Sequence, residues 1–141
     1  MKTFYHSLIM WIPIVLLFSC AAFGVELLEG NKIRTSEYFG LNDFGPFLLF
    51  IYTSLLVMLY PISFLPLTFI VSKYGKKPEF KMIIFTLFGG GMGTIVFKII
   101  YDERFIEEFN LSIISSIILF SVAGLLFALV EIAIKRNIKF V

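Results

Sequence analysis

Six residues that could form a small binding site fall near the centres of four apolar segments of the sequence. They provide a thiol, three hydroxyls, a helix-breaking proline and a glycine: Cys20, Tyr60, Pro61, Ser63, Gly91 and Ser121. If the segments cross a membrane, these residues lie at similar depth and can form a polar pocket near its midplane. None of them is charged at neutral pH, and proton-coupled transport normally needs a carboxylate or a histidine within the membrane.

A second proline follows Pro61 in the stretch LYPISFLP. Pro61 cannot donate a hydrogen bond to the carbonyl of Val57, and Pro66 cannot donate one to the carbonyl of Ile62. Each ring also crowds the preceding turn, so a helix through this stretch should kink near its middle. The kink is open to two interpretations, a structural bend or a broken helix of the kind that forms substrate sites in transporters.

Cys20 ends the stretch LFSC, which is similar to the cleavage site of bacterial lipoproteins. Two features favour an uncleaved membrane helix: Phe18 is bulkier than the residue usual at its position, and the chain stays apolar from Cys20 to Leu28. We therefore expect a helix, whereas cleavage would leave a lipid-modified Cys20 and three spans. As the sole cysteine, Cys20 cannot form an intrachain disulfide, and we expect it to fill space among apolar side chains.

The constellations that catalysis requires are missing from the sequence. The one histidine, His6, lies near the start and is expected to be solvated; no His and Cys cluster has metal-ligand spacing. Glu26, Glu131 and Lys98 lie within two turns of segment ends, where long side chains can reach the membrane surface. The stretch FGGGMGT lacks the phosphate-binding pattern GxxxxGK[ST]. We predict no enzymatic activity, no cofactor, no metal and no nucleic-acid binding.

The composition indicates which elements carry these residues. Of the 141 residues, 59% are hydrophobic and 16% charged, against roughly 45–50% and about 25% in soluble domains. Apolar runs of about 20 residues match the thickness of the hydrocarbon core, and helices satisfy their own backbone groups in lipid. We predict an all-α polytopic membrane protein, a single domain over residues 1–141 with a bundle of four transmembrane helices at residues 7–28, 47–71, 82–100 and 111–134.

Small residues spaced four apart on the third and fourth predicted helices favour close helix packing, which drives association within lipid. They form three pairs, Gly89 with Gly93, Ser112 with Ser116, and Gly124 with Ala128. We expect the third helix to pack on the fourth, or either one to pack on a copy from another subunit.

Basic residues predict the orientation. Eight lie on one predicted side, Lys2, Lys73, Lys76, Lys77, Lys81, Lys135, Arg136 and Lys139, and four on the other, Lys32, Arg34, Lys98 and Arg104. Because Lys and Arg concentrate in cytoplasmic loops, both termini and the loop SKYGKKPEFK are predicted to be cytoplasmic. That loop could hold anionic lipids.

The loop YDERFIEEFN, on the opposite side, carries clustered carboxylates. It is either a solvated acidic loop or a surface that attracts a cation or a basic peptide. If it forms a helical turn, Phe105, Ile106 and Phe109 could lie on the membrane surface.

The chain is rich in Ile, Phe and Lys and poor in Ala, which suggests an AT-rich bacterial genome. With LYPIS in the second predicted helix, FGGGMG in the third and YDE after it, the whole chain resembles small uncharacterised four-span membrane proteins of Bacillus-like bacteria. The resemblance implies a four-span fold and a location in the bacterial cytoplasmic (inner) membrane, and it supplies no activity and no site residues.

These observations predict a noncatalytic integral membrane protein that acts through helix–helix association, as an accessory subunit or as a protective (immunity) factor against a membrane-active peptide. Its expected partners are the lipid bilayer and either a second copy of the chain or another membrane protein. The alternative is a small oligomeric transporter or channel with a midplane site at the broken second helix. A phage-type lysis protein is a further alternative.

Overall fold

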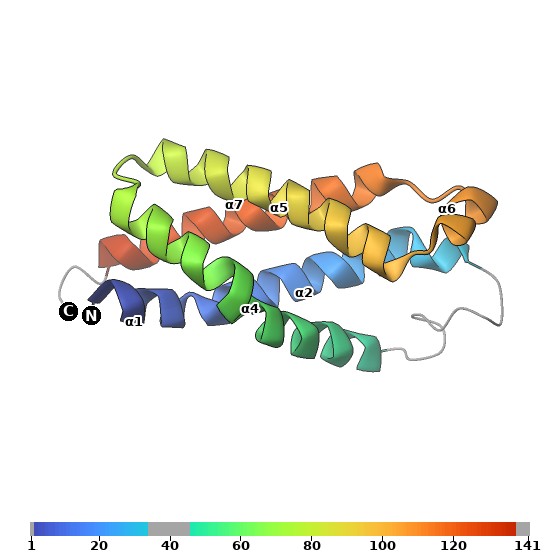
Figure 1. The fold of residues 1–141 in the computed structure, drawn as a ribbon, viewed down its shortest axis with the longest axis horizontal. Coiled ribbons are helices and arrows are strands. Elements are labelled where there is room, and N and C mark those ends of the chain that lie inside the picture. The colour runs from blue at the N-terminus through green and yellow to red at the C-terminus, as the bar shows by residue number, and fades with distance from the viewer. Residues whose placement is uncertain (1, 34–45, 138–141) are drawn as a thin grey trace.

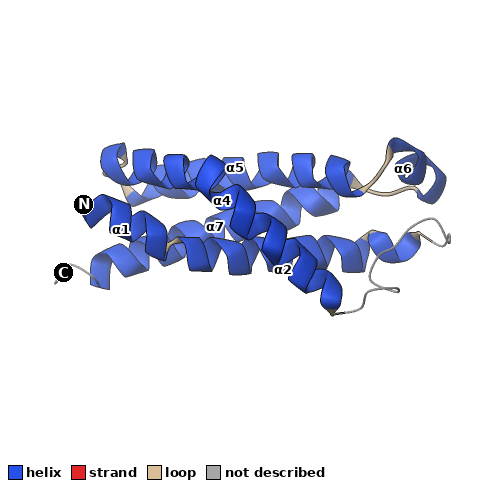
Figure 2. Cartoon of the chain, turned by 60° about the horizontal axis from the view of Figure 1, so that its bottom comes forward, coloured by secondary structure: helices blue, strands red, loops and turns tan. Residues whose placement is uncertain are grey.

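The computed structural model describes residues 2–33 and 46–137, and all regular structure within these ranges is helical (Figure 1; Figure 2). The elements are α1 (Lys2–Ile9), α2 (Trp11–Leu28), the short 3-10 helix η1 (Gly30–Lys32), α4 (Phe47–Tyr74), α5 (Pro78–Ile100), α6 (Glu103–Phe109) and α7 (Ile113–Asn137). Three helical segments in the described residues are long and apolar enough to cross a membrane: Phe4–Leu28, Pro78–Ile100 and Ile113–Asn137. A fourth span results if the two halves of α4 are taken together.

The helix boundaries differ from the predicted ones by a few residues. The first apolar segment begins before residue 7 and is interrupted at Met10, between α1 and α2. Pro13 explains the interruption, because its ring cannot donate to the carbonyl of Ile9 and crowds that turn. Helix α5 begins at Pro78 and not at residue 82, since proline is well tolerated in the first turn of a helix.

Helix α2 runs through Cys20 without a break. Residues before and after the cysteine, including Ile14, Phe18 and Val25, are buried in the same core. The thiol itself is exposed on the outside of the helix, so the expectation that Cys20 fills space among apolar side chains is wrong.

Helix α4 has the kink that its prolines predict. The segments Phe47–Ser63 and Leu65–Val71 are inclined by 50° to each other. The bend falls between Pro61 and Pro66, where two successive turns each lack a backbone donor. The hydroxyl of Ser63 donates to the carbonyl of Leu59 within its own helix.

The long helices are arranged in the order α5, α7, α2, α4, each packed on the next. Helices α4 and α5 are joined by a short turn, yet they make little contact with each other. The start of α1, the α4–α5 turn and the end of α7 lie together at one end of the molecule, the basic end; η1, α6 and the start of α7 lie at the other, the acidic end (Figure 1).

The most extensive packing joins α5 to α7. A side chain at Gly89 would collide with the carbonyl oxygen of Phe120, and one at Gly124 with that of Phe85, so these glycines let the two backbones approach closely. The hydroxyl of Ser116 also donates to the carbonyl of Gly93, 2.7 Å away. The third and fourth predicted helices therefore pack on each other within one chain.

Candidate functional site

The six residues proposed for a midplane pocket lie in different surroundings. Cys20, Pro61 and Gly91 are exposed, and Ser63 bonds within α4. Tyr60 is buried; its ring stacks on Trp11, with ring centres 5.5 Å apart, and its hydroxyl donates to the carbonyl of Ser7. The hydroxyl of Ser121 faces Gly90, on the α5–α7 contact.

The residues proposed for helix packing lie mostly along that contact. Gly89, Gly93, Ser116 and Gly124 are buried where α5 meets α7. Ala128 is also fully buried. Ser112 precedes α7, and its backbone N–H donates to Glu29, so it belongs to the acidic end instead.

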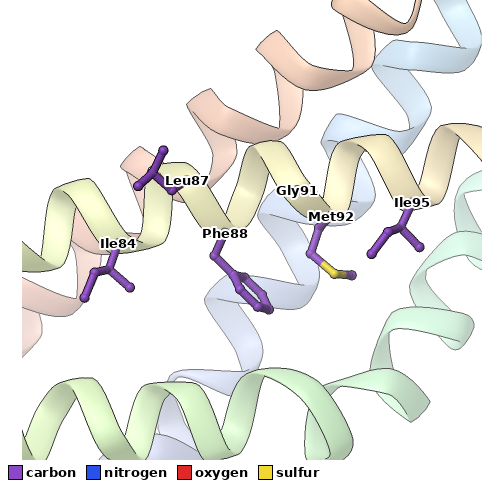
Figure 3. A pocket seen from close by; sticks show the side chains of 6 residues that line it. All are labelled: Ile84, Leu87, Phe88, Gly91, Met92 and Ile95. Atoms are coloured by element: carbon purple, nitrogen blue, oxygen red, sulfur yellow. The ribbon is translucent and has the colours of Figure 1, made fainter.

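A shallow apolar hollow of about 440 Å³ lies on the face of α5 that turns away from α7. All six residues that line it belong to α5: Ile84, Leu87, Phe88, Gly91, Met92 and Ile95. Figure 3 shows Phe88 and Met92 pointing from α5 toward the side where α4 runs. A Cβ atom added at Gly91 would meet no atom within 4 Å, so this glycine lies beside open space.

At the basic end, a buried ionisable cluster joins three helices. Glu131 of α7 is fully buried, and one of its carboxylate oxygens lies 3.1 Å from Lys81 Nζ of α5 and 3.4 Å from His6 Nε2 of α1. Lys81 is itself buried. The expectations that Glu131 reaches the membrane surface and that His6 is solvated are therefore wrong, because both side chains find polar contacts inside the molecule.

At the acidic end, two carboxylates from the end of α2 hold the neighbouring elements. Glu26 is fully buried, accepts a hydrogen bond from the Tyr101 hydroxyl at 2.7 Å and bonds to Tyr52 of α4. The sequence predicts that the side chain of Glu26 reaches the membrane surface. Like Glu131, it is buried instead, so this prediction is wrong. A side chain at Gly30 would collide with the carboxyl group of Glu26, so this glycine leaves room for the buried side chain.

Glu29 is the second of these carboxylates. It accepts hydrogen bonds from Lys32 Nζ at 2.8 Å, the Ser112 backbone N–H at 2.9 Å and the Ser115 hydroxyl at 2.6 Å. Burial raises the pKa of Glu29, but the hydrogen bonds outweigh burial and its pKa lies below the ordinary value. The ionised carboxylate therefore links the end of α2 to the start of α7.

The acidic loop forms the helix α6, whose carboxylates Glu103, Glu107 and Glu108 are exposed. Its apolar side chains Phe105 and Ile106 pack against the core at the end of the bundle. These two side chains are only partly buried, so their contact with a membrane surface stays a prediction. Among the described residues, no three His, Cys, Asp or Glu side chains gather closely enough to hold a metal ion.

A second cavity, of about 620 Å³, opens at the basic end between the α4–α5 turn and the last turns of α7. Its lining consists of five basic residues and three uncharged ones: Lys73, Lys76, Lys81, Lys135 and Arg136, with Gly75, Pro78 and Ile132. The lining contains no acidic residue, so it has a strong positive potential.

The sequence analysis does not predict the buried cluster, although the spacing of residues along α5 indicates that Lys81 belongs to a buried face. Steps of four along α5 give the residues that the structure buries on this helix: Lys81, Phe85, Gly89, Gly93 and Phe97. Residues four apart share one helix face. Lys81 could thus have been placed on the face that packs against α7.

No family model, curated protein or solved structure matches this chain. The resemblance to four-span proteins of Bacillus-like bacteria therefore stays a prediction.

Proposed function

We propose that the chain is a four-span protein of a bacterial cytoplasmic membrane, with its basic end in the cytoplasm. The described helices provide three apolar segments of sufficient length, and the bent α4 provides the fourth. Large apolar side chains on their outer surfaces, among them Met58, Ile62, Leu87 and Ile99, are more than 70% exposed, which suits contact with lipid and not with water. The excess of Lys and Arg at the basic end supports its cytoplasmic location.

Within that membrane, the protein acts noncatalytically by binding a transmembrane helix of another membrane protein, as an accessory or protective subunit. The observation that carries this proposal is the open space at Gly91. The space beside Gly89 and Gly93 is filled by α7 of the same chain. Gly91, in contrast, lies within a hollow on the opposite side of α5.

A helix is a better occupant of this hollow than a lipid chain. A glycine without neighbours lets a second backbone come close, and close backbone approach is what drives helix association in lipid. The flanking Phe88 and Met92 offer large side chains, and methionine adapts readily to an irregular partner surface. Transport through a midplane site has less support, since Cys20 and Pro61 are exposed on the outside of the molecule.

Site-specific photocrosslinking in membranes of the native host tests the proposal. A photoreactive benzoylphenylalanine replaces Ile95, an exposed residue that lines the hollow one turn from Gly91, in one variant and Ile118 in a control. Ile118 is an exposed residue of α7 outside the hollow. The partner should crosslink at position 95 and not at position 118, and mass spectrometry of the adduct identifies it.

A substitution that fills the hollow provides a second test of the same proposal. Gly91→Leu places a side chain in the open space, where its Cβ atom meets no other atom within 4 Å, so it should abolish copurification of the crosslinked partner at unchanged expression. Adducts to lipid alone at position 95, or a partner that is retained by Gly91→Leu, would contradict the proposal. An adduct to a second copy of this chain would show that the partner is another copy of the same protein and not a different membrane protein.

A further inference from the structure

The cavity at the basic end brings five cationic side chains from three helix ends into one space. Lys73 lies in the last turn of α4, Lys76 in the turn that follows, and Lys81 in the first turns of α5; Lys135 and Arg136 come from the last turn of α7. The chain separates the α7 residues from the others by more than 50 positions, so only the fold assembles this cluster.

The nearest carboxylate cannot balance this charge. Glu131 is fully buried, with Lys81 and His6 against the same oxygen. Glu79, the other described acid at this end, is exposed and does not line the cavity. Five basic residues thus face a single interior carboxylate, and the cavity keeps an excess of positive charge.

Helix ends modify this potential. The N-terminus of α5 reaches the cavity at Pro78, and its first backbone N–H groups have no side-chain cap, which favours an anion. The C-termini of α4 and α7 carry partial negative charge, but Lys73, Lys135 and Arg136 lie in those same turns and outweigh it.

Lys81 forms the floor of the cavity. Its ammonium group is held 3.1 Å from Glu131 Oε1, deep between α5 and α7. The four other basic side chains are exposed at the rim and can close around a ligand. The volume of about 620 Å³ lies in the range of small-molecule sites, about 300–1,000 Å³.

We propose that this cavity binds a phosphate group. A phosphate offers several strong acceptor oxygens to clustered lysines, and an arginine can engage two of them at once. The group can belong to the head group of an anionic phospholipid, because the cavity lies at the ends of the candidate membrane spans where head groups are found. It can also belong to a soluble phosphate compound.

The test uses the full chain in nanodiscs and single substitutions that leave the core untouched. Lys76→Gln and Arg136→Gln each remove one exposed charge from the cavity lining. Lys77→Gln is the matched control, since Lys77 is the exposed neighbour of Lys76 in the same turn but does not line the cavity. Native mass spectrometry measures how much phosphatidylglycerol the protein retains over phosphatidylcholine.

We expect selective retention of phosphatidylglycerol, weakened about fivefold by each lining substitution and roughly 30-fold by the two together, from about 1 kcal/mol per basic residue. Lys77→Gln should leave retention within about twofold. In a second arm, inorganic phosphate is titrated into the protein in nanodiscs that contain both phosphatidylcholine and phosphatidylglycerol. Binding of phosphate that displaces phosphatidylglycerol, with the same dependence on Lys76 and Arg136, assigns the site to a soluble phosphate compound.

Two results would overturn the proposal. An equal loss in Lys77→Gln and Lys76→Gln would show that charge near the membrane, and not the cavity, attracts the lipid. Failure of both phosphatidylglycerol and inorganic phosphate to bind would remove the site altogether.

Discussion

The ammonium group of Lys81 lies 3.1 Å from a carboxylate oxygen of Glu131, although 50 positions separate the two residues in the chain. Both side chains are buried, one on α5 and the other on α7. The pair marks the basic end of the α5–α7 contact, and His6 of α1 reaches the same oxygen. One carboxylate therefore links three helices that the chain connects only through long segments.

Removing one partner of this pair should be costly. Glu131→Gln leaves the ammonium of Lys81 buried without its counter-charge, and we expect the free energy of unfolding to fall by about 3–5 kcal/mol. The double variant Lys81→Met with Glu131→Gln should regain most of the lost free energy of unfolding, because no uncompensated buried charge remains. Thermal unfolding followed by circular dichroism in detergent measures both. Strictly additive losses in the double variant would show that the two residues are not coupled.

The hydroxyl of Tyr101 should stabilise the acidic end. Tyr101→Phe removes one of the two tyrosine donors to the buried Glu26 carboxyl group and is expected to cost about 1–3 kcal/mol, because a buried acceptor loses a partner. Tyr74→Phe, at an exposed tyrosine, serves as the control and should change stability by less than about 0.5 kcal/mol. Equal effects of the two substitutions would rule out a stabilising role for the Tyr101–Glu26 bond.

Glycines on two sides of α5 should respond differently to the same change. In Gly93→Leu the new side chain begins 2.7 Å from the carbonyl oxygen of Ser116, so overpacking is expected to cost about 1–3 kcal/mol or more. Gly91→Leu enters open space and should leave stability unchanged or slightly raised, since leucine favours helix over glycine. The midpoints of thermal unfolding of the two purified variants test this difference. A lower midpoint in Gly91→Leu than in the unchanged chain would contradict the open space beside Gly91.

Stability should fall at acid pH through Glu29. Its pKa in the folded protein lies below the ordinary value of 4.5, so folding favours the ionised form. The stabilisation is complete above about pH 4.5 and is lost as the pH falls through the lowered pKa of the folded state. Unfolding midpoints measured from pH 7 down to pH 3 should drop less steeply in Glu29→Gln than in the unchanged chain. Glu103→Gln, at an exposed position of α6, should keep the original slope; a reduced slope there would point to general charge effects instead.

The apolar helices long enough to cross a membrane and the kink of α4 were predictable from the sequence. Each depends on local properties: the length of an apolar run, the missing donors of Pro61 and Pro66, and the low charge of residues between the loops. Helical periodicity also points to the packing of α5 on α7 through Gly89 and Gly93, because small residues four apart share one helix face.

The polar interior was decided only by the tertiary structure. Glu26 and Glu131 lie near helix ends, and the length of their side chains alone predicts that they reach water. They are buried because Tyr101 and Lys81, far away in the sequence, supply hydrogen bonds and charge at those points, and a buried charge is tolerated only with such partners. The basic cavity depends in the same way on three helix ends that meet only in the folded protein, since local spacing along one helix does not determine which end of another helix lies beside it.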